Sequence, residues 1–131
     1  MHRKLIPWIV LLALAFAAHG ASAADRTTIG FGISGGNIPS YGVTIRSDGS
    51  VRTTGSPPHV RRQIAVGSVR RLRNEIQGAH LVSRRCPRVL PDFATHYIRL
   101  GGRTVSVHGT CEARFQRVWN DLWRAVARRS G

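Results

Sequence analysis

The end of the chain carries the strongest periodic pattern in the sequence. From Glu112 or Ala113 to Arg129, apolar residues recur at spacings of three and four, which predicts an amphipathic α-helix. Their stripe is roughly 140° wide, so one side of this helix must be buried against other elements. The stripe consists of Phe115, Val118, Trp119, Leu122, Trp123 and Val126. We expect its tryptophans to belong to the core rather than to a ligand-stacking surface.

Two-residue alternation earlier in the chain predicts strands. Residues 26–33 and 41–45 carry apolar side chains at every second position, and 50–54 follow a turn signal at Asp48-Gly49. Residues 60–65 are predicted as a further short strand. These strands supply the apolar surface that the helix requires.

The length of the first turn determines the register of its hairpin. A three-residue turn over 47–49 sets Ile45 opposite Val51, whereas a two-residue turn sets Ile45 opposite Arg52. A shift by one residue reverses every side chain of a strand, so the pairing of apolar residues is favoured. We expect the three-residue turn, with Gly49 in the left-handed conformation.

A second amphipathic helix is predicted in the middle of the chain, with Gly67 or Ser68 as its cap and Gly78 near its end. Its apolar side consists of Val69, Leu72, Ile76 and Ala79. The arginines between these positions are predicted to face solvent.

Residues 94–100 and 103–108 are predicted to form another hairpin across Gly101-Gly102, with Ile98 opposite Val105. The order of elements is therefore strands, helix, hairpin, helix. This order favours an α+β fold, in which a mostly antiparallel sheet of about five or six strands carries both helices on one face.

The first residues have the pattern of a secretory signal. Basic residues precede the apolar stretch 5–18, and Ala21-Ser22-Ala23 matches a signal-peptidase site. An uncleaved anchor is the alternative. We expect residues 1–23 to be removed and 24–131 to form a single domain, secreted or periplasmic.

Export determines how the two cysteines, Cys86 and Cys111, are interpreted. In an oxidising compartment a lone pair usually forms a disulfide, worth roughly 3.5 kcal/mol for a loop of about 25 residues. The two cysteines lack the C-x-x-C spacing that is typical of a redox pair, so a metal-binding or catalytic thiol is not favoured.

The exported part is strongly basic. It contains 18 Arg, no Lys and 6 acidic residues, so its net charge is +12. Such a surface attracts polyanions, although a GC-rich genome or solubility in solution also accounts for the excess. The preferred hypothesis is a non-enzymatic domain that binds an anionic polymer or an acidic protein of the cell envelope. Its predicted contacts are Arg114, Arg117, Arg124 and Arg128.

Two other functions remain as alternatives. The loop from Cys86 to Pro91 carries an exposed Arg88 between prolines, and a rigid, extended Arg loop is how secreted inhibitors block trypsin-like proteases. A small basic nuclease is the second alternative, with His96 and His108 on one hairpin. The histidine spacings match no metal motif, and no cofactor is predicted.

Part of the chain resembles a known family. The pattern Tyr41-x-Val43-Thr44-Ile45-x-x-Asp48-Gly49-x-Val51, the helix around 69–76 and the cysteines flanking a hairpin are similar to a family of small bacterial secreted domains of unknown function. The resemblance implies an exported α+β domain without an assigned activity or cofactor, and it supplies no catalytic residues.

Overall fold

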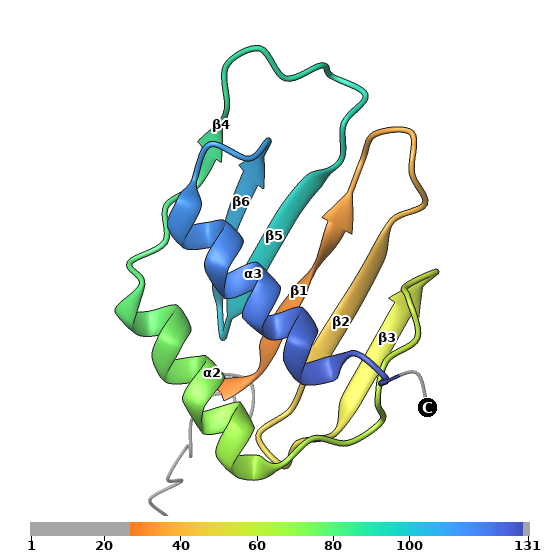
Figure 1. Ribbon diagram of the computed structural model, residues 1–131, viewed down its shortest axis with the longest axis vertical. Coiled ribbons are helices and arrows are strands. Elements are labelled where there is room, and N and C mark those ends of the chain that lie inside the picture. The colour runs from red at the N-terminus through yellow and green to blue at the C-terminus, as the bar shows by residue number, and fades with distance from the viewer. Residues whose placement is uncertain (1–26, 130–131) are drawn as a thin grey trace, which may run out of the picture.

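The computed structural model describes residues 27–129 as one twisted sheet with two helices on the same face (Figure 1). The sheet has 6 strands in the order β3-β2-β1-β5-β6-β4. The elements are β1 (Ile29–Ser34), β2 (Tyr41–Ile45), β3 (Val51–Gly55), α2 (Val66–Gly78), β4 (Arg84–Arg85), β5 (Thr95–Leu100), β6 (Arg103–His108) and α3 (Ala113–Val126). The predicted α+β architecture is therefore confirmed. The predicted signal, 1–23, lies outside the described residues, and within 27–129 no helix is long and apolar enough to span a membrane.

The β2–β3 hairpin has the predicted register, with Ile45 opposite Val51. The N–H of Gly49 donates to the carbonyl oxygen of Arg46, and the N–H of Arg46 donates to that of Ser50, each at 2.9 Å. Gly49 has a φ of 86°, which is the left-handed conformation expected at this position.

The central strand β1 joins the two hairpins, because it pairs antiparallel with both β2 and β5. The β5–β6 hairpin also has the predicted register, with Ile98 opposite Val105 and His96 opposite Val107. The two-residue strand β4 pairs parallel with β6 in a segment predicted as loop, since two residues are too short to show alternation.

The core lies between the sheet and the helices. Phe31 of β1 is fully buried, and its ring lies edge-on to Trp119 and Trp123 of α3, with centroids 5.6 and 5.2 Å apart. Trp119 is buried and Trp123 is half-buried. The prediction that these tryptophans belong to the core is confirmed.

Residues 60–65 do not form the predicted strand. They make isolated bridges instead, from Gln63 to Ser50 and from Val60 to Ala127. Because Val60 pairs with the residue that follows α3, this segment leaves β3 instead of continuing the sheet.

Two helix boundaries also differ from expectation. Helix α2 begins at Val66 with Ala65 in the capping position and no side-chain cap, so the predicted cap at Gly67 or Ser68 is wrong. Helix α3 ends at Val126 rather than at Arg129, because Ala127 adopts an extended ψ of 133° to meet Val60.

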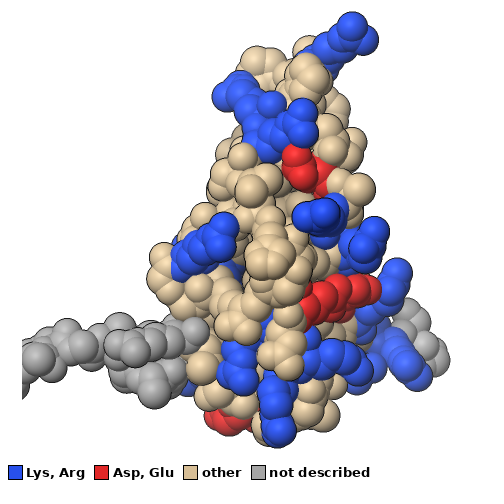
Figure 2. Space-filling view, turned by 90° about the vertical axis from the view of Figure 1, so that its left-hand side faces the viewer, with Lys and Arg blue, Asp and Glu red and all other residues tan. Residues whose placement is uncertain are grey.

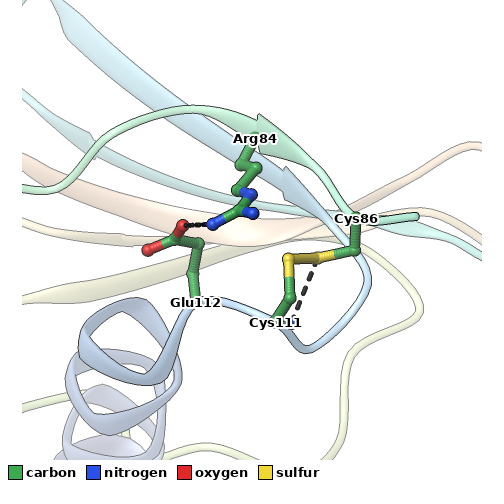
Figure 3. The surroundings of a disulfide bond; sticks show 4 residues. All are labelled: Arg84, Cys86, Cys111 and Glu112. Carbon is green, nitrogen blue, oxygen red and sulfur yellow. Dashed lines mark hydrogen bonds and ion pairs between the residues drawn. A yellow bond between two sulfur atoms is a disulfide. The ribbon is translucent and has the colours of Figure 1, made fainter.

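The predicted disulfide between Cys86 and Cys111 is present (Figure 3). It connects the end of β4 to the loop before α3, and an ion pair of 2.8 Å between Arg84 and Glu112 links the same two segments. The N–H of Cys86 donates to the carbonyl oxygen of His108, which holds the loop after β4 against β6. This disulfide is consistent with an oxidising compartment.

Candidate functional site

A concavity of about 730 Å³ lies beside β3, the first strand of the sheet order and therefore an edge. We call it the β3 cleft. Its lining residues are Ser50, Val51, Arg52, Thr53, Pro57, Pro58, His59, Val60, Arg61 and Arg62. One wall is β3 itself, and the other is the chain that returns from β3 toward α2. Ligand sites in proteins commonly have volumes of roughly 300–1,000 Å³.

The second wall of the β3 cleft is held by the end of α3. The N–H of Arg61 donates to the carbonyl oxygen of Val126 at 2.8 Å, and its Nε donates to that of Ala127 at 3.2 Å. The N–H of Arg128 donates to the carbonyl oxygen of His59 at 3.3 Å. These bonds fix the wall before a ligand arrives, which lowers the ordering cost of binding.

The two walls are joined at one end of the cleft, where the N–H of Val51 donates to the carbonyl oxygen of Arg62 at 2.9 Å. Beyond this bond the walls separate, because Val60 turns to Ala127. The cleft is therefore the space that a continued β3 pairing would have filled.

The charge of the β3 cleft is positive. Arg52, Arg61 and Arg62 line it together with His59, and none of its lining residues is acidic. Within residues 27–129, Arg52 and Arg62 are exposed and neither makes an ion pair. An anionic group entering the cleft would therefore meet cations that are not already neutralised.

The four arginines predicted as contacts are all exposed, but they do not form one patch. Arg124 is neutralised by Asp121 at 2.8 Å, an ion pair between residues three apart on α3. Arg128 lies beside the β3 cleft through its bond to His59. Only this member of the predicted set therefore belongs with the cleft.

Arg114 and Arg117 lie elsewhere, along a groove between α2 and α3 that also contains Glu75. Figure 2 shows the side of the molecule that carries α2 and β4, where basic side chains are scattered and acidic ones lie among them. The predicted arginines of α3 have carboxylates beside them, because Glu75 shares the groove with Arg114 and Arg117 and Asp121 pairs with Arg124.

The carboxyl groups of Glu75 on α2 and Asp121 on α3 both line a groove between these helices. Burial first, and the neighbouring carboxyl group of Asp121 second, raise the pKa of Glu75 to about 7. Arg71 and Arg117 act in the opposite direction, because their positive charges lower this pKa. The groove thus holds a carboxyl pair that no sequence spacing indicated.

The two histidines of the nuclease hypothesis are not brought together. His96 faces the helices, where its ring centroid is 4.8 Å from that of Trp119, and burial lowers its pKa. His108 lies on the opposite face, since it follows Val107, the partner of His96. Its Nε2 is 2.9 Å from the carbonyl oxygen of Phe93. The pair cannot share one substrate in this arrangement.

The inhibitor hypothesis required an extended backbone at Arg88. This residue is exposed, but its φ is 63°, so the expected extended conformation is wrong. A turn forms here because the disulfide and the contact of Val89 with the core pull the chain back after Pro87. Leu90, in contrast, remains exposed.

Among residues 27–129, no group of three or more His, Cys, Asp or Glu side chains is arranged to hold a metal ion. The cations that sequence reasoning missed are Arg52, His59, Arg61 and Arg62. The adjacent Arg61-Arg62 pair after two prolines was a partial signal. Its position opposite β3 follows only from the contact of Val60 with Ala127.

The chain was also compared with known proteins. No protein-family model, no curated protein and no solved structure matches it.

Proposed function

We propose that this chain is an exported domain that binds an anionic component of the cell envelope through the β3 cleft. The observation that supports the proposal best is the charge of the cleft, where three arginines and a histidine meet without an acidic lining residue. Guanidinium groups are well suited to this role, because they stay charged and donate paired hydrogen bonds to carboxylates, phosphates and sulfates.

The location belongs to the same proposal. The pattern of residues 1–23 is that of a secretory signal, and the Cys86–Cys111 disulfide requires oxidation that the periplasm or the cell exterior supplies. In either place the net charge of the exported part draws polyanions toward the protein over about one Debye length, roughly 8 Å at physiological salt.

The test is salt-dependent retention of the oxidised protein on heparin resin. We expect the wild type to bind at low salt and to elute in a gradient, because binding of a polyanion releases counterions. A triple variant that combines Arg52→Gln and Arg62→Gln in the cleft with Arg128→Gln beside it should elute at clearly lower salt.

A second triple variant removes the same charge from α3 and serves as the matched control. It combines Arg114→Gln, Arg117→Gln and Arg124→Gln, whose side chains lie near Glu75 or Asp121. Its elution should shift less than that of the cleft variant. Equal shifts would show that only net charge matters, and retention that ignores salt would overturn the proposal altogether.

A further inference from the structure

The edge of β3 has backbone groups that point into the β3 cleft. Arg46 donates to the carbonyl oxygen of Ser50, which makes this residue pair a hydrogen-bonded one. Hydrogen-bonded pairs alternate with non-bonded pairs along an antiparallel ladder, so the next bonded pair is Arg52 with Thr44 of β2. Val51 and Thr53 lie between the bonded positions, so their N–H and C=O groups point away from β2, toward the cleft.

The bonds at the start of the cleft agree with this alternation. The N–H of Val51 points outward and is taken by the carbonyl oxygen of Arg62. The next outward residue, Thr53, has no such partner in the described part of the chain, because Val60 has turned away to Ala127. The N–H and C=O of Thr53 and the C=O of Val51 are therefore left open to the cleft.

We propose that the β3 cleft accepts an extended acidic segment of a partner protein, which adds to the sheet as a strand beside β3. This inference rests on the proposed function and names its ligand. Added strands gain affinity from backbone hydrogen bonds and specificity from alternate side chains. The cleft offers both, because the open N–H and C=O groups of β3 can form the hydrogen bonds and the cations around them can select acidic side chains.

Side-chain alternation predicts the composition of that segment. Val51 and Thr53 share the face of β3 that lies toward the helices, and Arg52 lies on the opposite face. An added strand would place every second side chain beside Arg52 and the others toward Pro57 and Val60 of the second wall. Acidic and apolar residues in alternation fit this arrangement.

The same charges disfavour a second copy of this chain at the edge. Two β3 edges in contact would bring Arg52, Arg61 and Arg62 of each copy together, and like charges across paired strands are destabilising. The carboxylates of an acidic strand are attracted to these arginines, so the charges that repel a second copy favour an acidic partner.

Binding of a capped decapeptide of alternating Glu and Val, measured by titration calorimetry or fluorescence anisotropy, tests the inference. Thr53→Pro removes the outward N–H, and proline is tolerated in edge strands where the N–H faces solvent. We expect this variant to bind the peptide about tenfold more weakly, since it loses one hydrogen bond and its ring obstructs the edge. Thr53→Ala, which keeps the N–H, should bind like the wild type.

Two further measurements keep the result independent of the stability of Thr53→Pro. A peptide of the same sequence with every backbone nitrogen methylated keeps its charge but cannot form the strand pairing, so its binding should be lost. In the wild-type protein, hydrogen exchange at the amide of Thr53 should slow when the unmodified peptide is bound. Exchange at the amide of Arg70, on the solvent side of α2, should not change.

The outcomes separate this inference from the proposed function. Equal binding of the two peptides, unchanged peptide affinity in Thr53→Pro, or no peptide binding to the wild type would overturn strand addition. If salt-sensitive retention on heparin persisted in any of these cases, the proposed function would stand, with an anionic polymer as its ligand. Loss of heparin retention in the wild type would overturn the proposed function itself.

Discussion

Glu75 on α2 and Asp121 on α3 bring their carboxyl groups together in the groove between the two helices. Two carboxylates this close repel each other when both are ionised, so the arrangement favours a proton on one of them. The pair connects elements that are separated in the chain by β4, β5 and β6. The ionisation of this pair therefore makes the stability of the folded protein depend on pH.

The first prediction concerns this carboxyl pair. The pKa of Glu75 is about 7 in the folded protein, above its ordinary value of 4.5. The folded state therefore holds the proton more tightly, and stability falls as pH rises from about 4.5 through about 7. Glu75→Gln should unfold at a higher temperature than the wild type at pH 8, with little difference at pH 5.

Glu112→Gln is the matched control for Glu75→Gln. Glu112 pairs with Arg84 at 2.8 Å, so its neutralisation removes an attraction rather than a repulsion. This variant should not gain stability at pH 8. A gain for Glu75→Gln that is the same at pH 5 and pH 8 would contradict the role given to its ionisation.

The second prediction concerns His96, whose Nδ1 is buried without a hydrogen-bond partner. Burial lowers the pKa of His96, so the unfolded chain takes up the proton first and stability falls as pH drops below about 6.5. His96→Phe keeps an aromatic ring beside Trp119 and should resist unfolding at pH 5 better than the wild type.

Ile33, which lies opposite His96 on β1 and has no titratable side chain, provides the comparison for His96. Ile33→Val should leave the pH dependence of the unfolding temperature unchanged. If His96→Phe loses as much stability on acidification as the wild type, the acid sensitivity arises from another group.

The third prediction concerns the disulfide. The sequence separation of Cys86 and Cys111 is 25, and closing a loop of this length in the unfolded chain is worth about 3.5 kcal/mol. The double variant Cys86→Ala with Cys111→Ala should lose about this free energy of unfolding in urea. Reduction of the wild type should give a similar midpoint, and a loss below about 1 kcal/mol would show that the loop is held by its other contacts.

The fourth prediction concerns the turn between β2 and β3. A Cβ atom on Gly49 would clash with the carbonyl oxygen of Ile64, and the φ of 86° is unfavourable for other residues. Gly49→Ala should therefore lower the free energy of unfolding by more than about 1 kcal/mol. Gly102→Ala, in the turn of the other hairpin, has no atom within 4 Å of the new Cβ and should be nearly neutral.

Local patterns were sufficient for the secondary structure wherever one face of an element is buried. The hairpin registers followed from pairing Ile45 with Val51 and Ile98 with Val105, because a shift by one residue would have exposed the apolar face. The apolar stripe of α3 likewise required a sheet to cover it, and the two cysteines had only one possible intramolecular partner each.

The candidate site depended on contacts between distant residues. Whether residues 60–65 extended the sheet was decided by the pairing of Val60 with Ala127, a partner that follows α3 and that no local spacing reveals. That contact opens the β3 cleft and places Arg61 and Arg62 opposite Arg52.

The amino-acid order alone was enough to specify the layers and the registers of the two hairpins, because burial and strand alternation act over a few residues at a time. It also specified the disulfide, because the chain has only two cysteines. Which arginines lie together without a neighbouring carboxylate was decided only in the folded chain. Charges act through space, so Arg114 and Arg117 share a groove with Glu75, whereas within residues 27–129 no carboxylate pairs with the arginines of the β3 cleft.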